Sequence, residues 1–317
     1  SVRAKAALDG GEQRVHVARQ VAGGAANVAN NLKALGCHVT LAGITGTDSE
    51  GEMLAALVEK AGIEHCLIKD DGRPTTYKLR IVAQNQHMLR IDKESKQPVA
   101  ASVVDALWSE IKTILPTVDG VIVSDYAKGV VGISLMNRLM AEAHKQDLKV
   151  CVDPKGSDYS RYRGAYMITP NRREVGEAVQ RSVDMPEDFH EAVATLTEQT
   201  QSKVVLATCG ADGMLIYESD KPTVRLAAQA SEAFDVTGAG DTVIAVAAMG
   251  IFAGMDVGNS CDLANLAAGI AVGKFGTVVV LPEELRSRVA RGGSDQYAKI
   301  LDLDEAVAVS ERYRQIG

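Results

Sequence analysis

A short glycine turn followed by an aspartate is the part of this sequence best suited to chemistry. Gly238-Ala239-Gly240-Asp241 runs directly into an apolar segment from Thr242 to Phe252, which we predict to be a buried helix. The first N–H groups of a helix have no partner within it, and glycines let an anion approach them closely. Asp241 adjoins this site as a base for an attacking hydroxyl. Phosphoryl transfer requires both parts, donors for the moving phosphoryl group and a base for its acceptor.

The turn alone leaves a structural explanation open, because many helices begin with a glycine turn and an acidic residue. A second glycine-rich run, Gly23-Gly24-Ala25-Ala26-Asn27, lies near the other end of the chain. Its glycines suit close backbone approach to a ligand, and the Asn27 amide both donates to and accepts from hydroxyl groups. We therefore expect Gly23, Gly24 and Asn27 to contact a substrate rich in hydroxyls.

The composition is that of a globular protein and narrows the classes of function. The chain has 317 residues, 46% of them hydrophobic, and a formal net charge of −7. General nucleic-acid binding needs a basic surface, so we expect no such partner. Without a membrane-length apolar run or a signal-peptide core, we expect a cytoplasmic protein that does not bind membranes. The five cysteines are widely spaced, which indicates reduced thiols and no structural metal.

Alternating strand and helix patterns predict an α/β fold with a mainly parallel sheet and helices on both faces. The strands without polar alternation, typical of a buried parallel sheet, are 120–124, 149–152, 166–168 and 204–207. Ligands bind beyond the carboxyl ends of such strands. Polar residues follow each of these ends in turn: Asp125, Asp153, Asn171 and Thr208.

One segment departs from this rhythm. Between Thr75 and Ala83, Tyr77, Leu79 and Ile81 alternate with polar residues that include Lys78 and Arg80. This predicts a strand, and residues 88–91 return as its hairpin partner. The hairpin is either an ordinary sheet edge or a lid over the site. Lys78 and Arg80 are either solvated charges or ligands of a phosphate on the substrate.

The two glycine runs resemble the two signatures of the ribokinase (PfkB) family of sugar kinases, in the family's order. The resemblance extends from about Val21 to about Pro282 and implies a ribokinase-like fold with a small β lid, near residues 13–20 and 75–92. It also implies ATP and Mg²⁺ as cofactors. Asp241 would then be the catalytic base, and Gly238, Ala239 and Gly240 the anion turn.

The resemblance assigns the nucleotide side as well. Asn171 and Glu174 match the family's Asn-x-x-Glu element, in which Glu174 would hold Mg²⁺ through water, although the pair also fits a helix cap. The run 208–213 resembles the turn that carries nucleotide phosphate and ribose, and its glycines suit a hairpin equally well. Asn265 matches a position near adenine, or is a satisfied buried amide. The cofactor-binding candidates are thus Asn171, Glu174, Thr208, Gly210, Gly213 and Asn265.

A mixed-charge cluster predicts the kind of sugar. A plain sugar needs groups that bind hydroxyls, whereas extra cations favour a sugar phosphate. The cluster consists of Asp125, Lys128, Asp153 and Lys155. Several of these local runs resemble kinases of D-glycero-β-D-manno-heptose 7-phosphate, which in bacteria often precede an adenylyltransferase domain in one bifunctional protein.

The chain departs from the family pattern at its start. The family begins with an apolar strand that ends in a sugar-binding aspartate, whereas residues 1–20 offer only Asp9, in a polar stretch. We expect this strand to lie upstream of the numbered chain. We expect the kinase domain to comprise residues 1–295, and residues 296–317, with a helix over 301–314, to be a connector to an adenylyltransferase domain.

The sequence thus predicts an ATP-dependent sugar kinase with a heptose phosphate substrate, and a homodimer formed through the lid. A ribokinase-like kinase for another sugar, or a non-catalytic module that binds sugar phosphate, remains as an alternative. A dinucleotide-dependent oxidoreductase is excluded, because no Gly-x-Gly-x-x-Gly follows an N-terminal strand.

Overall fold

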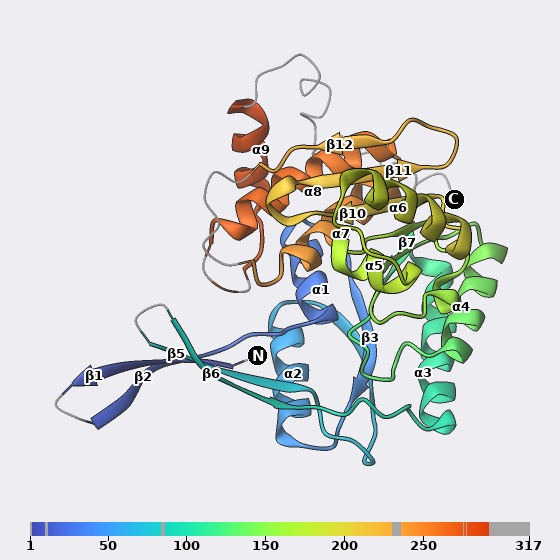
Figure 1. Cartoon of the computed structure of the whole chain (residues 1–317). Coiled ribbons are helices and arrows are strands. Elements are labelled where there is room, and N and C mark those ends of the chain that lie inside the picture. The colour runs from blue at the N-terminus through green and yellow to red at the C-terminus, as the bar shows by residue number, and fades with distance from the viewer. Residues whose placement is uncertain are drawn as a thin grey trace.

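A six-stranded sheet runs through the main body in the order β12-β11-β10-β9-β8-β7 (Figure 1). The computed structural model describes residues 2–9, 12–83, 86–229, 236–274, 276 and 278–291. Four strands are parallel: β7 (Gly120–Ser124), β8 (Lys149–Asp153), β9 (Met167–Ile168) and β10 (Val204–Thr208). β11 (Met214–Glu218) and β12 (Val224–Leu226) form an antiparallel edge. The predicted α/β fold is confirmed.

Helices cover both faces of this sheet. The helices that share one apolar core are α1 (Ala25–Ala34), α7 (Ala239–Phe252), α8 (Val257–Val272) and α9 (Pro282–Arg291). Those that share the other are α3 (Ala101–Ile114), α4 (Ile133–Lys145), α5 (Arg172–Val179) and α6 (Pro186–Thr200). Side chains of β8 alternate between the cores, with Cys151 in the first and Val150 and Val152 in the second. This explains why the strand is apolar throughout.

A second, two-stranded sheet lies beside the first. It contains β3 (Thr40–Thr45) and β4 (Glu64–Lys69) in parallel, joined by α2 (Ser49–Lys60). Asp48 caps α2, because its Oδ1 accepts a hydrogen bond from the Gly51 N–H at 3.1 Å. A cavity of about 670 Å³ separates β3 from β7. In the described part of the chain, each of these two strands is an edge strand of its sheet. The upstream strand expected from the family resemblance stays a prediction.

The lid is a four-stranded sheet that projects from the main body (Figure 1). Its strands follow the order β2-β1-β5-β6, with bounds β2 Glu12–Gln20, β1 Val2–Asp9, β5 Tyr77–Ala83 and β6 Gln86–Lys93. The predicted hairpin corresponds to β5 and β6, and the strand predicted near residues 13–20 to β2. β1 was not predicted. It pairs with both β2 and β5 and places Asp9 in the lid.

Two further predictions concern residues that the structure does not describe. The predicted connector helix and the domain boundary at residue 295 lie outside the described residues. In the part of the chain that the structure describes, no helix has the length and apolar character needed to cross a membrane.

Candidate functional site

The predicted glycine turn begins α7. Gly238 is its N-cap residue, with φ of 84°, a left-handed conformation that favours glycine. The first helical hydrogen bond runs from the Thr242 N–H to the Gly238 carbonyl at 3.0 Å, so the Gly240 and Asp241 N–H groups precede the helical ladder. A Cβ added at Gly240 would have no described atom within 4 Å. The turn thus offers backbone donors beside open space, as an anion site needs.

Asp241 lies in the first turn of α7 and is only 7% exposed. Two donors from distant parts of the chain reach its carboxylate. Asn27 Nδ2 lies 2.7 Å from Oδ2, and the Tyr126 hydroxyl donates to Oδ1 at 2.5 Å. The carboxylate is therefore fixed in orientation, and its remaining lone pairs can accept a proton from a substrate hydroxyl.

A chain of buried amides holds α1 against α7. Asn31 Nδ2 donates to the Asn27 carbonyl at 2.9 Å, and its Oδ1 accepts from the Val280 N–H at 3.4 Å. Thr242 Oγ1 lies 3.5 Å from the same oxygen. Because buried polar groups are costly without partners, this network helps to hold the two helices together.

The polar residues at the strand ends meet at one edge of the sheet, as predicted. The Asp125 N–H donates to the Asp153 carbonyl at 3.0 Å, and the Thr208 N–H donates to the Pro170 carbonyl at 2.9 Å. Asn171 forms an isolated parallel bridge with Thr208. The shared edge follows from the parallel alignment of β7 to β10.

Asn171 and Glu174 form the capping box of α5. The Glu174 N–H donates to Asn171 Oδ1 at 3.0 Å, and the Asn171 N–H donates to Glu174 Oε2 at 2.9 Å. Lys155 Nζ donates to the other oxygen, Oε1. The structural explanation of this pair is therefore confirmed, and in this arrangement Lys155 neutralises Glu174.

Asp125 anchors the loop after β7. Its Oδ1 accepts from the Ala127 N–H at 2.7 Å, while Oδ2 accepts from the Tyr162 hydroxyl at 2.6 Å and pairs with Arg161 at 3.1 Å. Both oxygens are used within the protein, so this geometry makes Asp125 a support of the loop. Its role in binding sugar stays a prediction.

The lid cations differ in their surroundings. Lys78 Nζ lies 3.4 Å from Asp92 Oδ2 and 3.3 Å from Glu94 Oε2, and Lys128 Nζ donates to Glu94 Oε1 at 2.6 Å. Sequence reasoning missed Glu94, which carries no motif. Lys78 and Lys128 are thus neutralised within the protein, which reduces their attraction for a substrate phosphate.

Arg80 occupies a more basic position of the lid. In the strand register, Arg80 lies opposite Arg90 on β6 and opposite Arg3 on β1, and Arg3 lies opposite Arg19 on β2. Four arginine positions therefore form one row across all four strands. Arg90 Nε pairs with Asp92 Oδ2 at 3.1 Å, so part of the charge at these positions is balanced within the lid. A role of Arg80 in binding a substrate phosphate stays a prediction.

The nucleotide candidates have clear structural roles. A Cβ on Gly213 would lie 1.9 Å from the Leu226 carbonyl, so this glycine is required by the β11–β12 hairpin. Gly210 has a φ of 60°, and a Cβ added there would meet no described atom within 4 Å. Asn265 Nδ2 donates to the Ala227 carbonyl at 2.8 Å, which ties α8 to the segment after β12. Their contacts with nucleotide stay predictions.

Two carboxyls of the site have raised pKa values. Burial raises the pKa of Asp241, and the hydrogen bonds from Tyr126 and Asn27 oppose that shift. Burial, followed by the charges of Asp241 and Glu174, raises the pKa of Asp153 to about 8. Thr169 Oγ1, which donates to Asp153 Oδ1 at 3.2 Å, lowers it in part. Raised carboxyl pKa values gathered at one sheet edge are typical of active sites.

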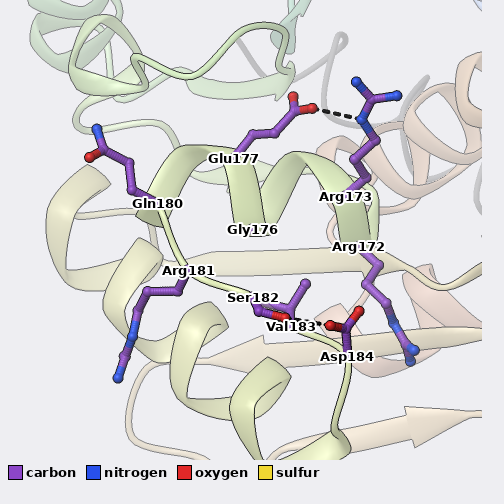
Figure 2. Close-up of a pocket in the computed structure, with 9 residues that line it drawn as sticks. All are labelled: Arg172, Arg173, Gly176, Glu177, Gln180, Arg181, Ser182, Val183 and Asp184. Carbon is purple, nitrogen blue, oxygen red and sulfur yellow. Dashed lines mark hydrogen bonds and ion pairs between the residues drawn. The ribbon is translucent and has the colours of Figure 1, made fainter.

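A separate open hollow of about 600 Å³ lies beside α5 (Figure 2). Arg173 pairs with Glu177 there at 2.6 Å, while Arg172 turns away and pairs with Asp212 at 3.4 Å (Figure 2). None of the predicted site residues lines this hollow. Each arginine of the hollow pairs with a carboxylate, Arg172 with Asp212, Arg173 with Glu177 and Arg181 with Glu191. We therefore take the Asp241 site as the candidate for the chemistry.

Sequence reasoning missed Tyr126, whose hydroxyl contacts Asp241. It follows the predicted strand 120–124 by two residues, and this position was the available signal. The structure brings together Asp241, Asn27 and Tyr126 at one point, and Asp153, Lys155 and Glu174 beside them. Arg80 and the nucleotide candidates come from other elements around this centre.

Curated relatives resemble the chain over most of its length. The Bifunctional protein HldE of Desulfatibacillum aliphaticivorans is 40% identical over 296 residues, which cover 93% of this chain and 60% of the relative. That of Sulfurimonas denitrificans is 38% identical, covering 94% of this chain and 62% of the relative. The chain therefore spans about three fifths of the length of these relatives.

Solved structures show the same fold. Phosphofructokinase-2 from Escherichia coli, in complex with substrates and products, aligns with a TM-score of 0.74 and 17% identity, covering 92% of this chain and 96% of that one. Arabidopsis thaliana ribokinase, complexed with ribose and ATP, aligns with a TM-score of 0.71 and 18% identity, covering 90% and 94%. The model of the family described as "pfkB family carbohydrate kinase" matches residues 3–284. With that match and a buried aspartate beside the anion turn of α7, the chain belongs to the pfkB family of carbohydrate kinases.

Proposed function

We propose that this sugar kinase transfers the γ-phosphoryl group of ATP to D-glycero-β-D-manno-heptose 7-phosphate, giving the 1,7-bisphosphate for ADP-heptose and lipopolysaccharide core synthesis. The observation that carries the kinase chemistry is the buried Asp241 carboxylate beside the open Gly238–Gly240 turn. The similarity to Bifunctional protein HldE supports the choice of sugar.

The reaction follows from this arrangement. Asp241 accepts the proton of the attacking sugar hydroxyl, and the hydroxyl oxygen forms a bond to the γ-phosphorus as the bond to ADP breaks. The N–H groups at the start of α7 stabilise negative charge on the transferred group. Asn27 holds Asp241 in place through its side-chain Nδ2, and its side-chain Oδ1 would accept a hydrogen bond from a sugar hydroxyl.

Mg²⁺ would screen the phosphate charge. In the described residues no three His, Cys, Asp or Glu side chains gather as a metal site. A magnesium ion that keeps most of its waters needs few protein ligands, so Glu174 remains a fitting outer ligand. Both of its oxygens are hydrogen-bonded to protein donors, which agrees with contact through water.

The lid supports a substrate that already carries a phosphate. Arg80 and Arg90 lie at paired positions on β5 and β6, and the row continues through Arg3 and Arg19. Lys78 contributes less, because Asp92 and Glu94 neutralise it. The second candidate, a kinase for another sugar or sugar phosphate, is favoured by the structural likeness to phosphofructokinase-2 and ribokinase.

Two partners complete the proposal. The relatives are bifunctional and longer than this chain. We therefore infer that the protein to which this chain belongs also contains an adenylyltransferase domain. Met88, Leu89 and Ile91 of β6 are 63%, 51% and 49% exposed, which supports dimerisation through the lid.

A coupled ATPase assay against a panel of sugars and sugar phosphates tests the substrate. Heptose 7-phosphate should be the best acceptor, and unphosphorylated heptose a poor one. Asp241→Asn should lower turnover by about two to four orders of magnitude while nucleotide affinity stays nearly unchanged. Near-normal turnover of this variant would disprove the assignment of the base, and equal use of both heptoses would disprove that of the substrate.

A further inference from the structure

Tyr126 and Asn27 approach the two oxygens of Asp241 from different elements. The Tyr126 hydroxyl, on the loop after β7, lies 2.5 Å from Oδ1, and Asn27 Nδ2, on α1, lies 2.7 Å from Oδ2. We propose that Tyr126 is a positioning residue that keeps the Asp241 carboxylate ionised and turned toward the sugar. This inference rests on the proposed function, because it assumes that Asp241 is the base.

The loop that carries Tyr126 is built to place it. Ala127, the next residue, has φ of 52°, a left-handed conformation that costs energy in a residue with a side chain. Asp125, on the other side, accepts the Ala127 N–H at 2.7 Å and is itself held by Tyr162 at 2.6 Å. A strained residue and a buried anchor on either side of Tyr126 leave its side chain little freedom.

The first glycine run fits the tyrosine ring. A Cβ added at Gly24 would lie 3.4 Å from Tyr126 Cε2, so the ring rests directly on this glycine. Gly24 also has φ of 62°, which disfavours a side chain there. The ring is thus held between its own loop and the start of α1, with the hydroxyl on Asp241.

The electrostatics require a donor at this point. Burial raises the pKa of Asp241 and so favours the neutral acid, the form that cannot act as a base. The Tyr126 hydrogen bond is the first of the two contacts that lower this pKa. Burial and the Asp241 charge raise the pKa of Tyr126 itself, so its hydroxyl stays protonated and donates.

Other described groups also face Asp241. From α1 comes the neutral amide of Asn27, and from the end of β8 comes Asp153, whose pKa is raised to about 8. Asp153 titrates in the enzyme with or without the Tyr126 hydroxyl. A difference between the two pH profiles therefore reports on Tyr126.

The test compares Tyr126→Phe with the unchanged enzyme in the pH dependence of kcat/KM for heptose 7-phosphate. Loss of the hydroxyl should move the acidic limb to higher pH by about one unit, so that activity falls about tenfold more at acidic pH than at alkaline pH. Tyr217→Phe, on β11, is the matched control and should leave the profile unchanged. Melting curves confirm folding, and Tyr126→Leu should move the same limb.

The outcomes separate this inference from the proposed function. A uniform loss at every pH, or no loss, in Tyr126→Phe would overturn the positioning role. If Asp241→Asn keeps its turnover, the proposed base fails, whatever Tyr126 does. If Asp241→Asn keeps only the expected residual turnover, adding Tyr126→Phe should cause no further loss of that turnover, because the hydroxyl acts only through the carboxylate. A further loss would contradict that route.

Discussion

Asn27 Nδ2 lies 2.7 Å from Asp241 Oδ2, in a contact that joins residues 214 positions apart in the chain. The first residue comes from the glycine run that opens α1, and the second from the glycine turn that opens α7. Both runs were chosen from sequence for separate reasons, the one for sugar hydroxyls and the other for phosphate. Their contact supports the proposal that sugar and phosphate are bound beside one carboxylate, as a phosphoryl transfer to a sugar requires.

Asn27→Ala should impair the base while leaving the fold intact. The change removes a donor from a buried carboxylate, and a hydrogen bond to a charged group is worth about 1.5–3 kcal/mol, so kcat/KM should fall about 10- to 150-fold. Asn31→Ala is the matched control, because Asn31 is fully buried and bonds only backbone and Thr242 in the described contacts. It should chiefly lower the free energy of unfolding, by about 1–3 kcal/mol. Equal kinetic losses in the two variants would contradict a direct role for Asn27.

The features predicted from sequence are those set by neighbouring residues. The alternation in 77–83 gave the β5 strand, because side-chain direction in a strand has a period of two. The glycine turn before Thr242 gave the start of α7, because the need for helix-start donors and positive φ is local.

What sequence could not supply depends on long-range pairing. Tyr126 meets Asp241 across 115 positions, and Lys78 is neutralised by Glu94, which has no pattern of its own. β1 was missed because its apolar residues are mostly alanines, so the strand is defined by its partners β2 and β5.

Gly240→Val should block the anion site without unfolding the protein. No described atom lies within 4 Å of the position that a Cβ would occupy, and φ at Gly240 is not positive. The branched side chain would fill the space beside the helix-start donors, so turnover and ADP affinity should both fall at least tenfold, with an unchanged melting temperature. Gly213→Ala provides the contrast, since its Cβ would lie 1.9 Å from the Leu226 carbonyl and should destabilise the fold. Unchanged ADP binding in Gly240→Val would place the anion site elsewhere.

Asp153 should make stability depend on pH. Its folded-state pKa of about 8 lies above its ordinary value of 3.8, so its contribution to stability is complete below about pH 4 and is lost as pH rises toward 8. Asp153→Asn removes this titration. The melting temperature of the variant should therefore rise relative to that of the unchanged protein as pH increases from 4 to 8. Asp71→Asn, at an exposed position, should show no such gain. A constant difference across this range would contradict the raised pKa.

Arg80 should determine recognition of the phosphate that the sugar already carries. In the strand register it lies opposite Arg90 and Arg3, and Lys78, two residues earlier on the same strand, is paired with Asp92 and Glu94. A charge-assisted hydrogen bond contributes about 1.5–3 kcal/mol, so Arg80→Ala should raise the KM for heptose 7-phosphate about 10- to 150-fold. Lys78→Ala should raise it less, because its charge is already neutralised. The KM for ATP should change little in either variant.

The acceptor itself provides the control for this prediction. If Arg80 binds the phosphate, Arg80→Ala should leave the already weak use of unphosphorylated heptose nearly unchanged, since that sugar brings no anion to the lid. The loss in kcat/KM should therefore appear with the 7-phosphate alone. Equal losses with both sugars would show that Arg80 supports the lid as a whole. A larger effect of Lys78→Ala than of Arg80→Ala would mean that the substrate phosphate displaces Asp92 and Glu94 from Lys78, and would move the phosphate site toward Lys128.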